Sequence, residues 1–170
     1  GYPLSGFWSY SFKGLNDETG YPEFNLDCGE TDDPTDFLVY SGQREASFTG
    51  GLTTRLRWKQ FTYSADFSAL LGAKKRLPNP FSSLERLPSP YSNMDRELLD
   101  RWTKPGDNTT IPAFYHGGTS SYIYLPNGDS GSMYDMWGNS DLRVVDASFL
   151  RCTQMSLSWN AGKGVCSALH

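Results

Sequence analysis

The sequence predicts an all-β fold, and three observations support that prediction. Several segments alternate polar and apolar residues with a period of two, the pattern of a strand with one apolar face. The 170 residues include 17 Gly and 10 Pro, which favour turns, and 10 Tyr, which favours strands. Helical periodicity is scarce. We therefore expect mainly antiparallel strands, long loops and one short helix.

The first predicted strand spans residues 6–13, where Trp8, Tyr10 and Phe12 share one face. Residues 14–46 follow it and are rich in turn formers, as in the stretch GLNDETGYPEFNLDCGETDDPTD. This composition predicts a long loop between the first strand and the second.

The second and third predicted strands span residues 47–58 and 61–71, and a tight turn at Lys59 and Gln60 joins them. In both strands, aliphatic and aromatic residues alternate with charged or hydroxyl-bearing ones. Arg55 and Arg57 belong to the polar side of the second strand, and Asp66 belongs to the polar side of the third.

Residues 73–148 form a second predicted long loop, and the short helix is expected within it, near residues 94–102. Asn93 is a plausible N-cap, and Asp95 and Glu97 suit the positive end of the helix dipole. A fourth strand is predicted at 149–160. Its alternation changes register near Cys152, which indicates a β-bulge.

The apolar faces of these strands can pack on a protein core or contact lipid, because a soluble sheet with one solvated face alternates in the same way. Three features favour lipid: strands near the roughly 9–11 residues that cross a bilayer, aromatic residues beside the short turn, and long connections that alternate with short ones. The sequence therefore predicts part of a transmembrane β-barrel. The residues predicted to face lipid are Leu52, Leu56, Trp58, Phe61, Tyr63, Phe67, Met155, Leu157 and Trp159.

Composition excludes other classes of protein. The net charge is −4 and no basic patch is clustered, which argues against nucleic-acid binding. Mean hydropathy is −0.52 and no apolar run approaches 18 residues, so a membrane-spanning helix is not expected. Three cysteines without a CxxC spacing do not predict a zinc site, although one pair could form a disulfide.

We expect no catalytic site, no metal site and no cofactor. The carboxylates within residues 27–36 and 127–132 are spaced loosely, as in calcium loops, but turn chemistry explains both stretches. Aromatic residues of the long loops are better candidates for contact with a ligand or partner, because their faces stack on sugar rings; they can equally pack the loop together. These candidates are Trp102, Tyr115, Tyr122, Tyr124 and Trp137.

Four stretches resemble the barrel of TonB-dependent outer-membrane transporters of the SusC/RagA type, found in Bacteroidetes. SGQREASFTGGLTTRLRWKQFTYSADFSALLGAKKR resembles a strand pair of that barrel, and LLDRWTKPGDNTTIPAF resembles an outer-loop stretch. NSDLRVVDASFLRCTQMSLSWN resembles a late-barrel segment, and SGFWSYSFKGLNDETGYPEF resembles the strand and loop upstream. The matches run in the family's order from about Gly6 to Asn160.

The resemblance implies a C-terminal part of the barrel, because the family's plug and TonB box have no counterpart in these residues. It implies a place in the bacterial outer membrane and the import of a large nutrient, an oligosaccharide or a peptide. A SusD-like surface lipoprotein and the TonB complex would be the partners, and no enzymatic activity is expected. The alternative is a stand-alone soluble β-module that binds carbohydrate through exposed aromatic residues.

Overall fold

The computed structural model describes residues 1–81, 93–114 and 121–160. The all-β prediction is confirmed, because antiparallel strands dominate and the helices are short. The chain divides into two units: unit 1 contains Gly1–Arg44 and Lys75–Val145, and unit 2 contains Glu45–Lys74 and Asp146–His170. Within the described residues, no helix has the length and apolar character needed to cross a membrane.

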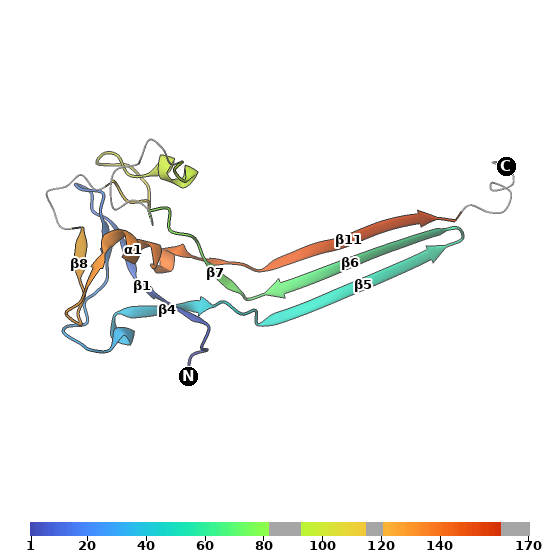
Figure 1. The fold of residues 1–170 in the computed structure, drawn as a ribbon, viewed down its shortest axis with the longest axis horizontal. Helices are drawn as coiled ribbons and strands as arrows, with labels where there is room; N and C mark the ends of the chain where they lie inside the picture. Colours follow the sequence, from blue (N-terminus) through green and yellow to red (C-terminus); the bar gives the residue numbers. More distant parts are fainter. Residues whose placement is uncertain (82–92, 115–120, 161–170) are drawn as a thin grey trace. The chain divides into compact units, whose positions relative to one another are not determined.

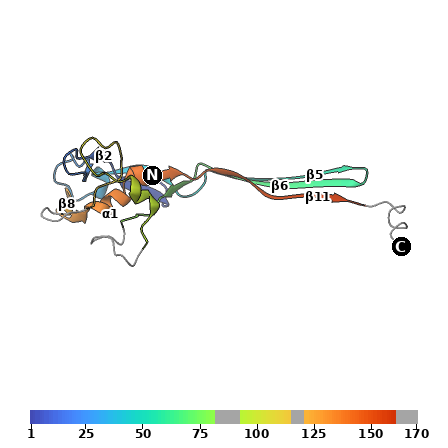
Figure 2. The same ribbon diagram turned by 90° about the horizontal axis from the view of Figure 1, so that it is seen from above.

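Unit 2 is a three-stranded antiparallel sheet in the order β11–β6–β5. Its strands are β5 (Phe48–Trp58), β6 (Phe61–Leu71) and β11 (Phe149–Trp159), each 11 residues long. All three lie within one residue of the ranges that alternation predicts. Figure 1 shows the three strands side by side, and Figure 2 shows them as a thin layer.

A register shift interrupts the pairing of β11 with β6 between Cys152 and Gln154, so the predicted β-bulge is confirmed. Thr153 is the additional residue at this point, and its hydroxyl donates to the carbonyl of Asp66 at 3.1 Å. Because the extra residue shifts the alternation by one, Leu150 and Cys152 lie on the same face as Met155.

Unit 1 includes most of the two segments that were expected to be long loops. The strand expected over residues 6–13 is in fact two strands with different partners. β1 (Gly6–Tyr10) pairs with β4 (Leu38–Gln43), and β2 (Phe12–Leu15) pairs with β3 (Pro22–Phe24). The chain changes partner at Ser11, whose carbonyl accepts a hydrogen bond from the Asn25 amide at 2.9 Å.

The remaining elements are short. They are η1 (Pro34–Asp36), β7 (Lys74–Arg76) paired with β10 (Val144–Asp146), η2 (Arg96–Asp100), β8 (Tyr122–Tyr124) paired with β9 (Ser130–Ser132), α1 (Met133–Gly138) and η3 (Asp141–Arg143).

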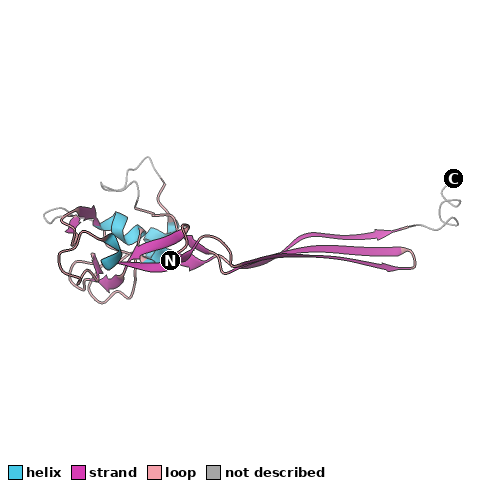
Figure 3. Cartoon of the chain, turned by 90° about the horizontal axis from the view of Figure 1, so that it is seen from below, coloured by secondary structure: helices cyan, strands magenta, loops and turns pink. Residues whose placement is uncertain are grey.

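The expected helix near residues 94–102 is the 3₁₀-helix η2, and its cap is Asp95 rather than Asn93. The Asp95 carboxylate accepts the amide hydrogen of Glu97 at 3.0 Å. The single α-helix of the described chain, α1, lies instead in a stretch expected to be irregular. Figure 3 shows the helices among the elements of unit 1.

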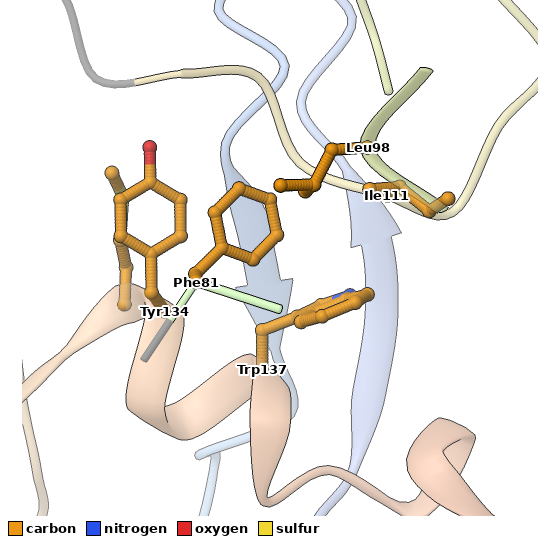
Figure 4. Packing of buried hydrophobic residues seen from close by; sticks show 6 residues of the cluster. Phe81, Leu98, Ile111, Tyr134 and Trp137 are labelled. Carbon is orange, nitrogen blue, oxygen red and sulfur yellow. The ribbon is translucent and has the colours of Figure 1, made fainter. Parts of the chain in front are cut away.

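Unit 1 has a hydrophobic core built around aromatic rings. The Phe81 ring stacks on Tyr134 with 4.4 Å between ring centroids, and it meets the Trp137 indole edge-on at 5.4 Å (Figure 4). Polar tips in this core have partners: Trp137 Nε1 donates to the Thr110 carbonyl at 2.9 Å. The buried cluster comprises Phe81, Leu98, Ile111, Met133, Tyr134 and Trp137.

A buried guanidinium ties three segments of unit 1 together. Arg143 is 3% exposed and forms a two-pronged ion pair with Glu97 of η2. It also donates to the Pro78 carbonyl at 2.6 Å and lies over the Trp137 ring, 4.5 Å from its centroid. Because each contact comes from a different part of the chain, Arg143 fixes η2 and the Pro78 segment against the core.

Candidate functional site

The sheet of unit 2 has two chemically different faces, and cross-strand register assigns each residue to one of them. Leu52 is opposite Phe67, Leu56 is opposite Tyr63, and Tyr63 is in turn opposite Leu157. All nine residues predicted to face lipid therefore lie on a single face, which we call the apolar face.

Large hydrophobic side chains of the apolar face are exposed. Leu56 is 67% exposed and Leu157 is 71% exposed, whereas Tyr63 and Phe67 on the central strand are half-buried. An isolated water-soluble sheet would leave this area in contact with water, at a cost that grows with its area. Exposed members of the face are Phe48, Leu52, Leu56, Trp58, Phe61, Leu71, Leu150, Met155, Leu157 and Trp159.

Three of these exposed residues, Phe48, Leu71 and Leu150, were not among the predicted lipid contacts. Phe48 and Leu71 are opposite one another at the end of the sheet away from the tight turn. Both residues continue the period-two pattern of the predicted lipid contacts on their strands, so alternation could have identified them. Leu150 lies beyond the bulge, so simple alternation back from Met155 places it on the wrong face.

Aromatic residues form a row at the tight-turn end of the apolar face. Trp58 is opposite Phe61, and Phe61 is opposite Trp159, so three rings lie across three strands. The Trp159 indole donates to the Gln60 side chain at 3.1 Å, and the Lys59 ammonium lies 5.3 Å from the centre of the Trp58 ring. Rings with polar or charged neighbours of this kind suit the boundary between an apolar medium and water.

The opposite face of the sheet, the polar face, carries hydroxyls and charges. The Ser64 and Ser156 hydroxyls hydrogen-bond to each other across β6 and β11 at 2.7 Å. Arg55 is opposite Ser64 and Arg57 is opposite Thr62, and both arginines are exposed. Segregation of polar and apolar side chains is therefore complete along β5 and β6, apart from Thr54 on the apolar face and Leu70 on the polar face.

The structure separates the loop aromatics into buried and exposed ones. Trp137 has no exposed surface, so its predicted ligand contact is corrected to a role in the core. Trp102 is half-buried and lies against Gly20, where an added Cβ would come within 2.3 Å of the indole. Tyr115 lies outside the described residues.

Tyr122 and Tyr124 are exposed, with 55% and 79% of their surface accessible. They alternate with Ile123 on β8, so they share one side of that strand. Tyr124 lines an open pocket of 860 Å³, whose other walls come from residues 26–32 and 125–128. The Thr31 amide donates to the Pro126 carbonyl at 3.2 Å, which holds the two walls together.

The carboxylates singled out for possible calcium binding stabilise turns instead. Asp33 caps η1 by accepting the Thr35 amide at 2.8 Å, and this bond lowers the pKa of Asp33. In the second stretch, the Asp129 carboxylate accepts a hydrogen bond from the Asn127 side-chain amide at 2.9 Å. Within the ranges that the structure describes, no group of three His, Cys, Asp or Glu residues is placed to hold a metal ion.

The described cysteines are free thiols in different settings. Cys28 is exposed in unit 1, and Cys152 is exposed at the bulge on the apolar face of unit 2. Cys166 lies outside the described residues.

Comparison with known proteins shows a similarity of fold. No protein-family model and no curated protein matches this chain. The chain is similar to a chain in the structure of the RagAB peptide importer in the open-open state, with a TM-score of 0.60 and 22% sequence identity. The similarity covers 97% of this chain and 17% of that chain, so these residues span about one sixth of its length.

Proposed function

We propose that this chain is part of an outer-membrane transporter that imports a large nutrient, and that the sheet of unit 2 forms part of its barrel wall. The observation that carries the proposal is the sheet with one exposed apolar face and one polar face. In a barrel wall, lipid would cover the apolar face and water would solvate the polar face.

The dimensions of the sheet support this proposal. Eleven residues rising about 3.3 Å each give strands about 33 Å long. At the tilt of about 45° that is usual in membrane barrels, this length spans nearly the whole apolar band, which is about 25 Å tall. The aromatic row of Trp58, Phe61 and Trp159 then marks one boundary of that band.

Import of a nutrient is supported by the similarity of fold to a chain of the RagAB peptide importer structure. The cargo that we propose is a peptide or an oligosaccharide. A SusD-like surface lipoprotein and the TonB complex would be the partners of the whole protein, and the chain would carry no catalytic activity. Unit 1 would lie outside the membrane, where Tyr122 and Tyr124 could contact cargo or partner.

The test is to locate the intact protein, with any residues that its reading frame adds to this chain. Cells expressing it are fractionated, and the outer-membrane fraction is probed for the protein before and after washing with high salt and with alkali. We expect the protein in that fraction after both washes. Recovery in the soluble fraction would contradict the proposal.

A second candidate function is a soluble β-module that binds carbohydrate. The observation that favours it is the pair of exposed tyrosines, one of which lines the open pocket of unit 1. This candidate requires a protein that stays monodisperse without detergent and binds glycans through Tyr122 or Tyr124. The exposed apolar face of unit 2 counts against it.

A further inference from the structure

Two arginines lie next to each other on the polar face of the sheet. Arg55 and Arg57 are two residues apart in β5, so their side chains leave the same face about 7 Å from each other. Both are exposed. The strand holds them at this spacing through its continuous pairing with β6, which has no bulge over the full length of β5.

The balance of charge on this face is positive, although the chain as a whole is acidic. The charged residues that face this side from all three strands are Arg55, Arg57, Asp66 and Arg151. Asp66 is opposite Thr53, diagonal to Arg55, and Arg151 is opposite Ser68. Within the residues that the structure describes, none of these four belongs to an ion pair.

The residues directly opposite the two arginines carry neutral hydroxyls. Ser64 and Thr62 are directly opposite them on β6, and Ser156 and Ser158 follow on β11. Hydroxyls add donors and acceptors without neutralising a guanidinium. The pair therefore offers two planar groups of N–H donors in contact with water, beside a hydroxyl-bearing surface.

Guanidinium groups bind carboxylates through two parallel hydrogen bonds, and a second guanidinium nearby strengthens the preference for a negative ligand. We propose that Arg55 and Arg57 bind carboxylate groups of a dissolved solute at this face and so favour acidic cargo. This proposal depends on the proposed function in one respect, which is that the polar face borders the path of the cargo. A lipid headgroup is a poor fit, because both arginines lie on the face opposite the exposed apolar residues.

The experiment measures binding of defined probes to the intact protein purified in detergent, by calorimetry in 0.1 M salt. The acidic probes are trigalacturonate and triglutamate, and the neutral counterparts are maltotriose and N-acetyl-trialanine amide. We expect at least one acidic probe to bind more tightly than its neutral counterpart. Which acidic probe binds distinguishes a sugar from a peptide as the source of the carboxylate.

Variants then assign the binding to the arginine pair. We expect R55Q/R57Q to weaken binding of the acidic probe about tenfold or more. R151Q removes one positive charge from the same face, about 16 Å from Arg55 by strand register and spacing. This distance exceeds the screening length of about 10 Å, so a change of about twofold or less is expected. R55K/R57K keeps the charge without the two-pronged geometry and should bind with intermediate affinity.

Three results would overturn the proposal: no preference for either acidic probe, undiminished binding by R55Q/R57Q, or equal weakening by R151Q. These results do not test the transport proposal, which is tested separately by cell fractionation. If the protein is soluble but R55Q/R57Q still weakens binding of the acidic probe, the carboxylate site stands and the transport proposal fails.

Discussion

Units 1 and 2 place their hydrophobic residues in opposite ways. In unit 1 a cluster of large apolar side chains packs into a closed core, where Trp137 and Leu98 are at most 2% exposed. Among the described residues of unit 2, the buried hydrophobic ones are Ala65 and Ala73, while Leu56 and Leu157 are exposed. Unit 1 thus supplies its own apolar environment, whereas the sheet of unit 2 needs one from its surroundings. This contrast separates a unit with a closed core from a sheet with an uncovered apolar face.

The largest effect is expected from opening the core of unit 1. Trp137→Ala removes the ring that contacts Phe81 and leaves the Thr110 carbonyl without its indole donor. We expect a loss of about 4 kcal/mol of unfolding free energy, measured by chemical denaturation with hydrogen exchange followed over unit 1.

The matched change in unit 2 is Leu56→Ala, which shortens an exposed side chain and creates no protein cavity. It should leave the exchange of unit 1 unchanged and cost less than about 1 kcal/mol. Equal destabilisation by the two variants would remove the distinction between a closed core and an uncovered face.

The second prediction concerns the buried ion pair of unit 1. Glu97→Ala leaves the Arg143 guanidinium charged, buried and without its carboxylate, so we expect a loss of about 3 kcal/mol. The control is Glu23→Ala, which breaks the exposed pair with Lys13 and should cost less than about 1 kcal/mol. If both variants lose the same stability, burial does not set the strength of these pairs.

The third prediction sharpens the difference between the two faces of unit 2. Met155→Lys puts a charge near the middle of the apolar face, and we expect it to cost about 2 to 4 kcal/mol for the protein folded in lipid vesicles. Gln154→Lys puts the same charge one residue away on the polar face and should be nearly neutral. Tolerance of Met155→Lys would argue that water already reaches the apolar face.

The smallest effect is a pH dependence at Asp146, the last residue of β10. Hydrogen bonds from Ser148, and then from Lys74, lower the pKa of Asp146 to about 2. A lowered pKa stabilises the fold above about pH 4, and this contribution is lost as pH falls through about 2. Asp146→Asn should remove that part of the pH dependence in unfolding experiments. A pKa near 4 for Asp146, measured by NMR, would contradict the prediction.

Local alternation predicted the strands of unit 2 because its signal lies within each strand. The period of two over residues 48–58 and 61–71 specifies both the strands and their faces, and the break near Cys152 marks the bulge. The partner of a strand is set by tertiary packing and not by the local sequence. The change of partner at Ser11, from β4 to β3, was therefore not predictable.

Unit 1 was harder to predict because its elements depend on packing. Helix α1 has six residues and no side-chain cap, so burial of Met133, Tyr134, Met136 and Trp137 stabilises it rather than its own propensity. Trp137 and Tyr124 are both aromatic residues in the second long segment, and nothing local in the sequence says that the first is enclosed and the second exposed.

The most direct test of the account is the environment of Leu56. Spin labels are attached at single cysteines replacing Leu56, Phe67 and Thr62, with the native cysteines changed to serine, in the intact protein within lipid vesicles. We predict that labels at Leu56 and Phe67 collide with oxygen dissolved in the bilayer and escape a water-soluble nickel complex, while the label at Thr62 on the polar face shows the reverse. Labels at Leu56 and Phe67 that neither reagent reaches, as in a dry protein interior, would contradict the account.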